Sequence, residues 1–264
     1  MRARFIGWIA VVAAVLNLSP GIYAQTAPGP GAAKATADLS GVWGRRIVRA
    51  ASGVFADEAG GVPFLGFTKA EPPLQPAALE TYKANRKGVA DARLKGRDEL
   101  DPVASCFPPG PTRIFTDARP FEIRQTPKVV YILSEWDHWV RRIYADGREH
   151  PYGYPSTWMG LSLGKYEGNT LVADTVDISD QTWIDSLGHP HSEELHVVER
   201  FRRVNRNTLE IEFTFNDPKT YTKPWTAKKV YQLQPPDYEM KPDVLCEQYR
   251  KLGLKKDGFE FLNP

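Results

Sequence analysis

All five histidines of this sequence lie within one stretch of 59 residues: His138, His150, His189, His191 and His196. Histidine titrates near neutral pH, so its side chain suits proton transfer and metal binding. The histidines are densest in the segment Asp185-Ser-Leu-Gly-His-Pro-His-Ser-Glu-Glu-Leu-His196, which also carries three carboxylates. This composition predicts a site in which imidazoles and carboxylates act together.

Metal-free acid–base catalysis is the chemistry that this segment favours. Either Asp185 or Glu194 would orient an imidazole ring by accepting a hydrogen bond from it. Either His191 or His196 would then move the proton. Isomerases, lyases and hydratases acting on a small apolar or aromatic molecule use such chemistry. The sequence therefore favours a cofactor-independent enzyme, with a non-catalytic binding protein for the same kind of molecule as the alternative.

Further polar and aromatic side chains are candidates for the same site. Arg142 or Tyr144 would stabilise negative charge on an enolate or carbonyl oxygen. His150 adds a polar group for ligand binding. Tryptophan rings would line an apolar cavity, although such rings more often fill the core of a β protein. The tryptophans concerned are Trp136, Trp139, Trp158, Trp183 and Trp225.

The same histidines admit a metal-dependent alternative. His189 and His191 flank a proline, and His196 follows on the next expected strand. With Glu194 they would give a ligand set of the open catalytic kind. The spacing matches no standard ligand motif, so we expect no resident metal. Structural roles also remain open, with Asp185 capping a turn and His196 packed in a barrel wall.

Other catalytic classes lack their sequence signatures. The chain has no Gly-x-Ser-x-Gly nucleophile elbow, no phosphate-binding glycine-rich loop and no dinucleotide-binding fingerprint. Nucleotide-dependent chemistry is therefore not expected, and no cofactor is implied.

Residues 1–24 have the features of a secretory signal peptide. Arg2 and Arg4 precede an apolar run from Phe5 to Leu16, and Ala24 provides a small residue before the expected cleavage site. The run is too short to span a bilayer. We therefore expect a secreted protein, periplasmic in a Gram-negative bacterium, without stable membrane insertion after cleavage.

Removal of that segment changes the charge of the chain. The full sequence has 34 Lys and Arg against 32 Asp and Glu, and the mature chain would have 32 of each. A net charge of zero provides no general attraction for nucleic acid or an anionic membrane. We therefore expect a small-molecule partner and no nucleic acid. Residues 25–37 are rich in Pro, Gly and Ala and would form a disordered linker before a single domain at 38–264.

Two cysteines, Cys106 and Cys246, remain in the mature chain. An even number in an exported protein favours one disulfide, and two buried free thiols are the alternative. The bridge would close a loop of about 140 residues and contribute roughly 4–5 kcal/mol in the chain-entropy treatment. It would also tie the C-terminal segment to the domain.

The rest of the chain has the pattern of an antiparallel β protein with irregular N-terminal segments. Turn residues such as Asp146-Gly147 and Glu167-Gly168-Asn169 separate segments rich in β-forming residues. Short connections favour antiparallel pairing, and the number of strands favours a closed, lipocalin-like barrel over a two-sheet sandwich. A short helix is expected at 76–86. Strands are expected at 38–43 continuing to 49, and at 121–125, 129–135, 139–144, 160–166, 170–178, 194–204, 208–215 and 227–233.

The expected strand at 194–204 has polar side chains on both faces. Its two faces carry Leu195, Val197, Glu199 and Phe201 and, opposite them, Glu194, His196, Val198 and Arg200. Neither face is wholly apolar. We therefore expect one face to line a partly polar cavity inside the barrel, with surface ion pairs as the alternative.

Four segments are distinctive in combination: Asp38-Leu-Ser-Gly-Val-Trp43, Arg141-Arg-Ile-Tyr-Ala-Asp-Gly-Arg-Glu-His150, Trp158-Met-Gly-Leu-Ser-Leu-Gly-Lys-Tyr-Glu-Gly-Asn-Thr-Leu-Val-Ala-Asp-Thr175 and Thr182-Trp-Ile-Asp-Ser-Leu-Gly-His-Pro-His-Ser-Glu-Glu-Leu-His-Val-Val-Glu-Arg-Phe201. Together they resemble a widespread family of secreted bacterial proteins without an established activity. The resemblance covers about residues 38–250 and implies export but no mechanism. Gly41 and Trp43 on a first strand are also similar to the start of lipocalin-like barrels, which implies a barrel fold.

Overall fold

The computed structural model of the protein describes residues 37–49, 55–58, 62–95, 101–241 and 245–246. The chain divides into two units, Met1–Ala35 and Thr36–Pro264, and all described residues belong to the second. The expected signal peptide at 1–24 lies outside the described residues. So does the expected linker at 25–37, except for its last residue.

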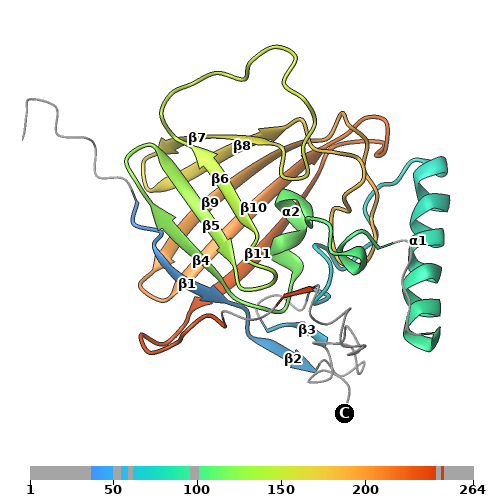
Figure 1. Cartoon of the computed structure of the whole chain (residues 1–264), viewed down its shortest axis with the longest axis horizontal. Coiled ribbons are helices and arrows are strands. Elements are labelled where there is room, and N and C mark those ends of the chain that lie inside the picture. The colour runs from blue at the N-terminus through green and yellow to red at the C-terminus, as the bar shows by residue number, and fades with distance from the viewer. Residues whose placement is uncertain (1–36, 50–54, 59–61, 96–100, 242–244, 247–264) are drawn as a thin grey trace, which may run out of the picture. The chain divides into compact units, whose positions relative to one another are not determined.

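Nine strands of the described chain form a closed barrel (Figure 1). Neighbours follow the order β1-β11-β10-β9-β8-β7-β6-β5-β4, and the pairing of β1 with β4 completes the ring. This confirms the barrel that the sequence predicts. The strands are β1 Gly41–Gly44, β4 Phe121–Gln125, β5 Val129–Ser134, β6 Val140–Tyr144, β7 Leu161–Glu167, β8 Thr170–Val176, β9 His196–Asn205, β10 Thr208–Asn216 and β11 Trp225–Leu233.

The barrel strands form where the sequence alternates apolar and polar side chains. In β10, Leu209, Ile211 and Phe213 are buried, while Glu212 and Thr214 are exposed. Each strand therefore has one face inside the barrel and one face outside. All eight strands predicted from residue 121 onward are present, and the bounds of β4 agree with the prediction to the residue.

One pair of neighbouring strands departs from the antiparallel pattern that the sequence predicts. β6 and β7 are parallel, with Ile143 opposite Ser162 and Tyr144 opposite Leu163. Parallel neighbours need a long crossover, and residues 145–160, which we call the crossover loop, provide it. The rule that short connections favour antiparallel pairing does not apply here, because the crossover loop is long.

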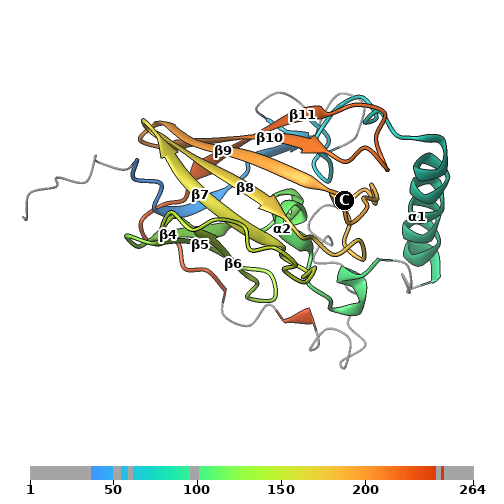
Figure 2. The same ribbon diagram turned by 90° about the horizontal axis from the view of Figure 1, so that it is seen from above.

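The middle of the barrel is occupied by aromatic side chains. Two short helical segments, α2 Gly110–Arg113 and η2 Ile114–Thr116, lie between the barrel walls (Figure 2). Phe115 is fully buried, and its carbonyl oxygen accepts a hydrogen bond of 2.7 Å from the Tyr231 hydroxyl. These rings occupy the space where the sequence predicts a partly polar cavity. The Phe115 ring packs at centroid distances of 5.3–6.3 Å against Phe121, Phe201, Phe213 and Tyr231.

A buried ion pair crosses the barrel interior. Arg141 of β6 donates two hydrogen bonds to Glu199 of β9, one of them from Nη1 to Oε1 at 2.7 Å. The guanidinium also donates to Ser162 Oγ at 3.2 Å and Thr175 Oγ1 at 3.0 Å, and to the Pro111 carbonyl at 3.1 Å. Buried charges persist when such partners satisfy them. Glu199 is therefore an interior structural charge rather than part of a surface ion-pair ladder.

A small hairpin is fixed to the barrel by a second buried ion cluster. β2 Ile47–Arg49 pairs with β3 Phe55–Asp57. Asp57 accepts hydrogen bonds from Lys229 Nζ at 2.7 Å and from Arg45 Nη1 at 3.2 Å. Burial, together with the positive charge of Arg45, lowers the pKa of Lys229 to about 8. The strand predicted to continue to residue 49 is interrupted at Arg45, since this side chain turns inward to the cluster.

A helix and a disulfide complete the domain. α1 Pro76–Lys95 starts at the predicted proline and runs past the predicted end at residue 86. The disulfide between Cys106, which follows η1 Val103–Ser105, and Cys246 is present with a Cα–Cα distance of 5.6 Å, as the sequence predicts. Among the described helices, none has the length and apolar character needed to cross a membrane.

α1 packs beside one end of the barrel (Figures 1 and 2). This end carries the β8–β9 connection at 177–195 and the β10–β11 connection at 217–224, and we call it the barrel mouth. Asn85 of α1 donates a hydrogen bond of 2.9 Å to the Gly188 carbonyl. The segment before the helix is also attached there, because Gln75 N donates to the Thr220 carbonyl at 2.8 Å.

Candidate functional site

Two imidazoles and one carboxylate meet on the outer face of the barrel. Asp174 Oδ1 lies 3.2 Å from His150 Nε2, and Asp174 Oδ2 lies 3.0 Å from His196 Nε2. The side chains are 44% exposed for Asp174, 38% for His196 and 30% for His150. We call this group the Asp174 cluster. Its exposure leaves it open to a molecule that approaches from solvent.

Strand pairing and the crossover loop bring the three residues together. β8 and β9 pair with Asp174 opposite Val198, which places His196 diagonally across from Asp174. Ala173 and Val197 are buried inside the barrel, so strand alternation turns Asp174 and His196 outward. His150 belongs to the crossover loop, and its position depends on the parallel pairing of β6 and β7.

Two other sequence-predicted residues lie on the same outer face. Tyr144 is opposite Leu163, and Leu163 is opposite Asp174, so the three form one row across β6, β7 and β8. Strands lie about 4.8 Å apart, so the backbones of Tyr144 and Asp174 are about 10 Å apart. Arg148 packs over the Tyr144 ring, 3.9 Å from its centroid. Arg142 is exposed on β6 two residues before Tyr144, so strand alternation places it on the same face. This face therefore carries four predicted residues: Arg142, Tyr144, His150 and His196.

Asp174 and His196 stabilise each other's charged forms. The hydrogen bond and charge of His196 lower the pKa of Asp174, and the same hydrogen bond raises the pKa of His196. Asp174 accepts from Nε2 of both rings, which leaves Nδ1 of each without a hydrogen-bond partner among the described residues. A ring nitrogen of this kind is an acid when protonated and a base when neutral. Each ring therefore presents one nitrogen that Asp174 does not occupy.

A second group at the barrel mouth has one imidazole between two carboxylates. His189 Nδ1 lies 2.7 Å from Asp185 Oδ2, and His189 Nε2 lies 2.9 Å from Glu71 Oε2. The Tyr82 ring of α1 stacks on the imidazole with centroids 4.1 Å apart, and its hydroxyl donates to Glu71 Oε1 at 3.3 Å. The side chain of His189 is 4% exposed and that of Glu71 is 63% exposed. We call this group the His189 cluster.

The loop that carries His189 is held by its own carboxylate and by α1. Asp185 Oδ1 accepts hydrogen bonds from the backbone N–H groups of Leu187 at 3.0 Å and His189 at 3.3 Å. Gly188 has a φ of 96°, and a Cβ there would lie 3.0 Å from Asn85 Cβ. Both the backbone conformation and the close approach of α1 therefore require glycine.

The charges around His189 favour its protonated form. Burial opposes a positive charge on the ring, but the negative charges of Asp185 and Glu71 and their hydrogen bonds outweigh it, so the pKa of His189 is raised. Burial and the charge of Glu71 raise the pKa of Tyr82 to about 12, which keeps the phenol a donor. The sequence points to Asp185 and His189 but not to Glu71 and Tyr82. No local sequence pattern identifies Glu71 or Tyr82, because each contacts His189 from a segment more than 100 residues away in the sequence.

His191 and Glu194 belong to neither cluster. His191 is buried, its Nδ1 donates to the Ser192 carbonyl at 2.9 Å, and its Nε2 accepts from Thr182 Oγ1 at 2.6 Å. Burial lowers the pKa of His191, which favours this neutral ring. Glu194 lies on the surface and forms an ion pair of 2.8 Å with Lys219. Both residues thus have partners that explain them without a substrate.

The four residues of the metal-dependent alternative have separate surroundings. His189 and His196 lie in different clusters, His191 is buried beside Thr182, and Glu194 is paired on the surface. In the part of the chain that the structure describes, no three His, Cys, Asp or Glu side chains are placed to hold a metal ion. The structure therefore offers no assembled site for that alternative among these residues.

Comparisons with protein families, with curated proteins and with solved structures find no match for this chain. Its function is therefore inferred from the geometry of its own side chains.

The tryptophans predicted to line a cavity are spread over the molecule. Trp183 and Trp225 are buried near the barrel mouth, and Trp136 and Trp139 pack beside the disulfide. Trp158, near the end of the crossover loop, stacks on the exposed ring of Phe107 with centroids 5.0 Å apart. Of the five, Trp158 alone shares a segment with a residue of the Asp174 cluster.

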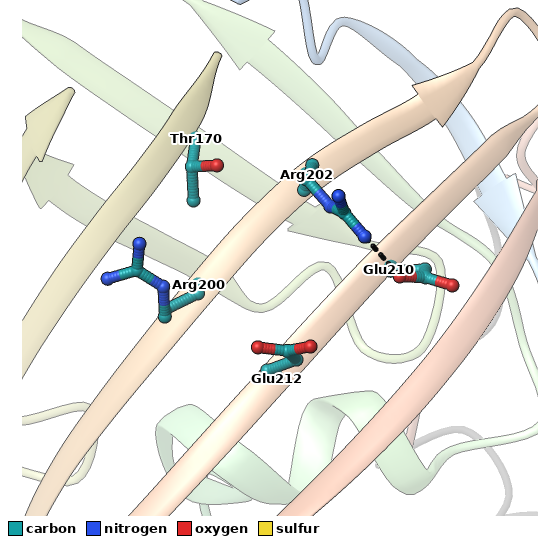
Figure 3. A pocket seen from close by; sticks show the side chains of 5 residues that line it. All are labelled: Thr170, Arg200, Arg202, Glu210 and Glu212. Carbon is teal, nitrogen blue, oxygen red and sulfur yellow. Dashed lines mark hydrogen bonds and ion pairs between the residues drawn. The ribbon is translucent and has the colours of Figure 1, made fainter. Parts of the chain in front are cut away.

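A groove lies farther along the outer face of β8, β9 and β10. Its volume is about 270 Å³, and it is lined by Thr170, Arg200, Arg202, Glu210 and Glu212 (Figure 3). Arg202 donates to Glu210 at 3.0 Å, and Arg200 donates to Glu167 at 3.0 Å. These contacts form a ladder of surface ion pairs. Both guanidinium groups of the groove are already paired, so we do not place a substrate there.

Proposed function

We propose that the protein is a secreted, cofactor-independent acid–base enzyme of the isomerase, lyase or hydratase type, with the Asp174 cluster as its catalytic site. The observation that carries the proposal is the sharing of Asp174 by two part-exposed imidazoles from different elements. This arrangement sets a proton donor beside a proton acceptor, which acid–base catalysis requires. The disulfide supports export, because such bonds persist in oxidising compartments.

The two imidazoles take different roles in this proposal. The hydrogen bond to Asp174 raises the pKa of His196, so His196 retains its proton and is the acid. His150 is the base and takes a proton from a carbon next to a carbonyl group. His196 gives its proton to the enolate oxygen or to the neighbouring carbon. One ring gains the proton that the other loses, and exchange with solvent restores the starting state.

The surroundings of the cluster support a small apolar or aromatic substrate. Tyr152 and Tyr154 are exposed on the crossover loop, two and four residues after His150. Aromatic side chains fill the barrel interior, so the proposed substrate binds between the crossover loop and the outer face. Tyr144 lies on the same row as Asp174 and is the proposed donor to a developing oxyanion.

Deuterium exchange tests this proposal with a panel of simple carbonyl compounds as probes. Cyclic ketones, enones and lactones, with and without aromatic rings, are incubated with the protein in D2O, and NMR records the loss of proton signals next to the carbonyl. We expect exchange with the wild type and its loss in Asp174→Asn. His196→Asn and His150→Asn should each lower the exchange rate.

His138→Asn is the matched control for these variants. His138 is an exposed histidine outside both clusters, and its φ of 53° suits asparagine. The His138→Asn variant should catalyse deuterium exchange at the same rate as the wild type. Equal exchange in wild type and Asp174→Asn would overturn the proposal. A ligand-induced change of tryptophan fluorescence without exchange of any compound would favour the non-catalytic binding protein.

A further inference from the structure

The two hydrogen bonds of His189 require two protons on its ring. Ionised Asp185 and Glu71 only accept hydrogen bonds. A neutral imidazole has a single N–H, so it can donate to one carboxylate at a time. An imidazolium between the two carboxylates satisfies both contacts at once, at 2.7 Å to Asp185 and 2.9 Å to Glu71.

Loss of one proton must break the bond to Glu71 rather than the bond to Asp185. Asp185 is buried and is fixed by two backbone N–H groups. The Glu71 side chain is 63% exposed and can turn to water. A neutral ring would keep its Nδ1 proton on Asp185 and direct the Nε2 lone pair at the Glu71 carboxylate, which is repulsive.

Glu71, in the segment before α1, contacts two other parts of the structure through its two oxygens. Oε2 meets His189 of the β8–β9 connection, and Oε1 accepts from the Tyr82 hydroxyl of α1. Release of Glu71 thus removes an attachment of α1 to the barrel mouth. The bond from Asn85 to the Gly188 carbonyl does not depend on pH, so α1 loosens without leaving the barrel.

We propose that the His189 cluster is a proton-operated latch, in which Glu71 ties α1 to the barrel mouth while His189 is protonated and swings away when the ring becomes neutral. Release exposes the Nε2 lone pair of a ring oriented by Asp185, which is the arrangement of a general base. The latch is independent of the proposed chemistry at the Asp174 cluster. Asp185 and Glu71 contact the His189 ring, and Tyr82, which interacts with Arg86, contacts Glu71. The other charged and titratable groups that interact with Asp185 are Tyr221, Lys229 and Arg113, the last of which is paired with Asp101.

Hydrogen exchange of the full-length protein tests the latch. NMR of the ¹⁵N-labelled His189 ring first gives its titration midpoint. Protection factors of the α1 amides between residues 79 and 88, corrected for intrinsic exchange rates, are then compared on the two sides of that midpoint. We expect protection in the wild type to fall at least tenfold as His189 loses its proton.

Two variants at position 71 make the test specific. In Glu71→Gln the amide accepts from a protonated ring and donates to a neutral one, so protection should stay high on both sides of the midpoint. In Glu71→Ala protection should stay low on both sides. Glu80→Gln is the matched control, because Glu80 is an exposed α1 carboxylate paired with Lys83, and it should keep the tenfold fall. Constant protection in the wild type, or an equal fall in Glu71→Gln, would overturn the latch.

Discussion

The Asp174 cluster and the His189 cluster use the same two side-chain types in inverse proportion. On the outer face two imidazoles share one carboxylate, and at the barrel mouth two carboxylates share one imidazole. In the first case one carboxylate contacts both rings, and each ring keeps a second nitrogen that the carboxylate does not occupy. In the second case one ring, when protonated, donates to both carboxylates at once.

Burial widens the difference between the clusters. His196 is held by one hydrogen bond to a part-exposed carboxylate, so water competes for both partners. His189 lies under the Tyr82 ring, and its inner carboxylate is fully enclosed. Charge interactions weaken in solvent and strengthen away from it. The same histidine–carboxylate contact therefore suits catalysis in the exposed Asp174 cluster and attachment of α1 in the buried His189 cluster.

Of the changes considered, replacing Asp174, the carboxylate shared by the two rings of the outer cluster, should have the largest effect, and the effect is on the rate of proton exchange. Asp174→Asn removes the anion that orients both rings, and we expect the rate of proton exchange to fall about 1,000-fold, within the range for loss of acid–base catalysis. Initial rates by NMR measure this. Asp237→Asn, a change of the same type at an exposed residue outside both clusters, should leave the rate unchanged. A loss of equal size in both variants would show that the Asp174 cluster has no special role.

Replacing the enclosed carboxylate of the inner cluster should act on stability instead. Asp185→Ala leaves Nδ1 of the buried His189 ring and two backbone N–H groups without an acceptor, and we expect a loss of about 3 kcal/mol or more in the free energy of unfolding. Urea unfolding measures this loss. The matched change Asp174→Ala should cost less than about 1 kcal/mol, since that carboxylate is part-exposed. Similar losses at the two positions would remove the distinction that burial makes between them.

The sequence predicts the fold well because the barrel signal is local. Alternation in segments such as Leu209–Phe215 identifies strands, turn residues mark their ends, and two cysteines in a chain that is expected to be exported predict the disulfide. The parallel pairing of β6 and β7 is the exception, since the general pattern of short connections predicts the opposite. Its signal is the length of the crossover loop, which allows the chain to return to the same end of the barrel.

The sequence predicts the two clusters only in part, because each is assembled by tertiary packing. Asp185 contacts an imidazole, but the ring is that of His189 rather than that of His191 or His196. The sequence does not mark Asp174, since its role depends on the register between β8 and β9. Glu71 reaches His189 across 118 positions of sequence, and no local pattern marks it. Residue types therefore predict the chemistry, and the packing of distant segments determines the partners.

Removing the inner imidazole should change how stability depends on pH. The raised pKa of His189 means that the folded state holds its proton more tightly than the unfolded state. Its contribution is therefore fully present below about pH 6.5 and is lost as the pH rises through the folded-state pKa. We expect the wild type to exceed His189→Asn by about 2 kcal/mol at pH 5 and by less at pH 9. Urea unfolding at several pH values measures this, and a constant difference would contradict it.

Removing the His196 imidazole should have the smallest effect on the free energy of unfolding, although the pKa of His196 is raised like that of His189. Its side chain is 38% exposed, so solvent screens the interaction with Asp174 and we expect a stability loss of only a few tenths of a kcal/mol in His196→Asn at pH 5. Because that interaction faces solvent, 1 M NaCl should abolish the loss, whereas the loss in His189→Asn should persist. Urea unfolding at low and high salt compares the two variants. If salt removes both losses equally, His189 is no better enclosed than His196, and the contrast between the two clusters fails.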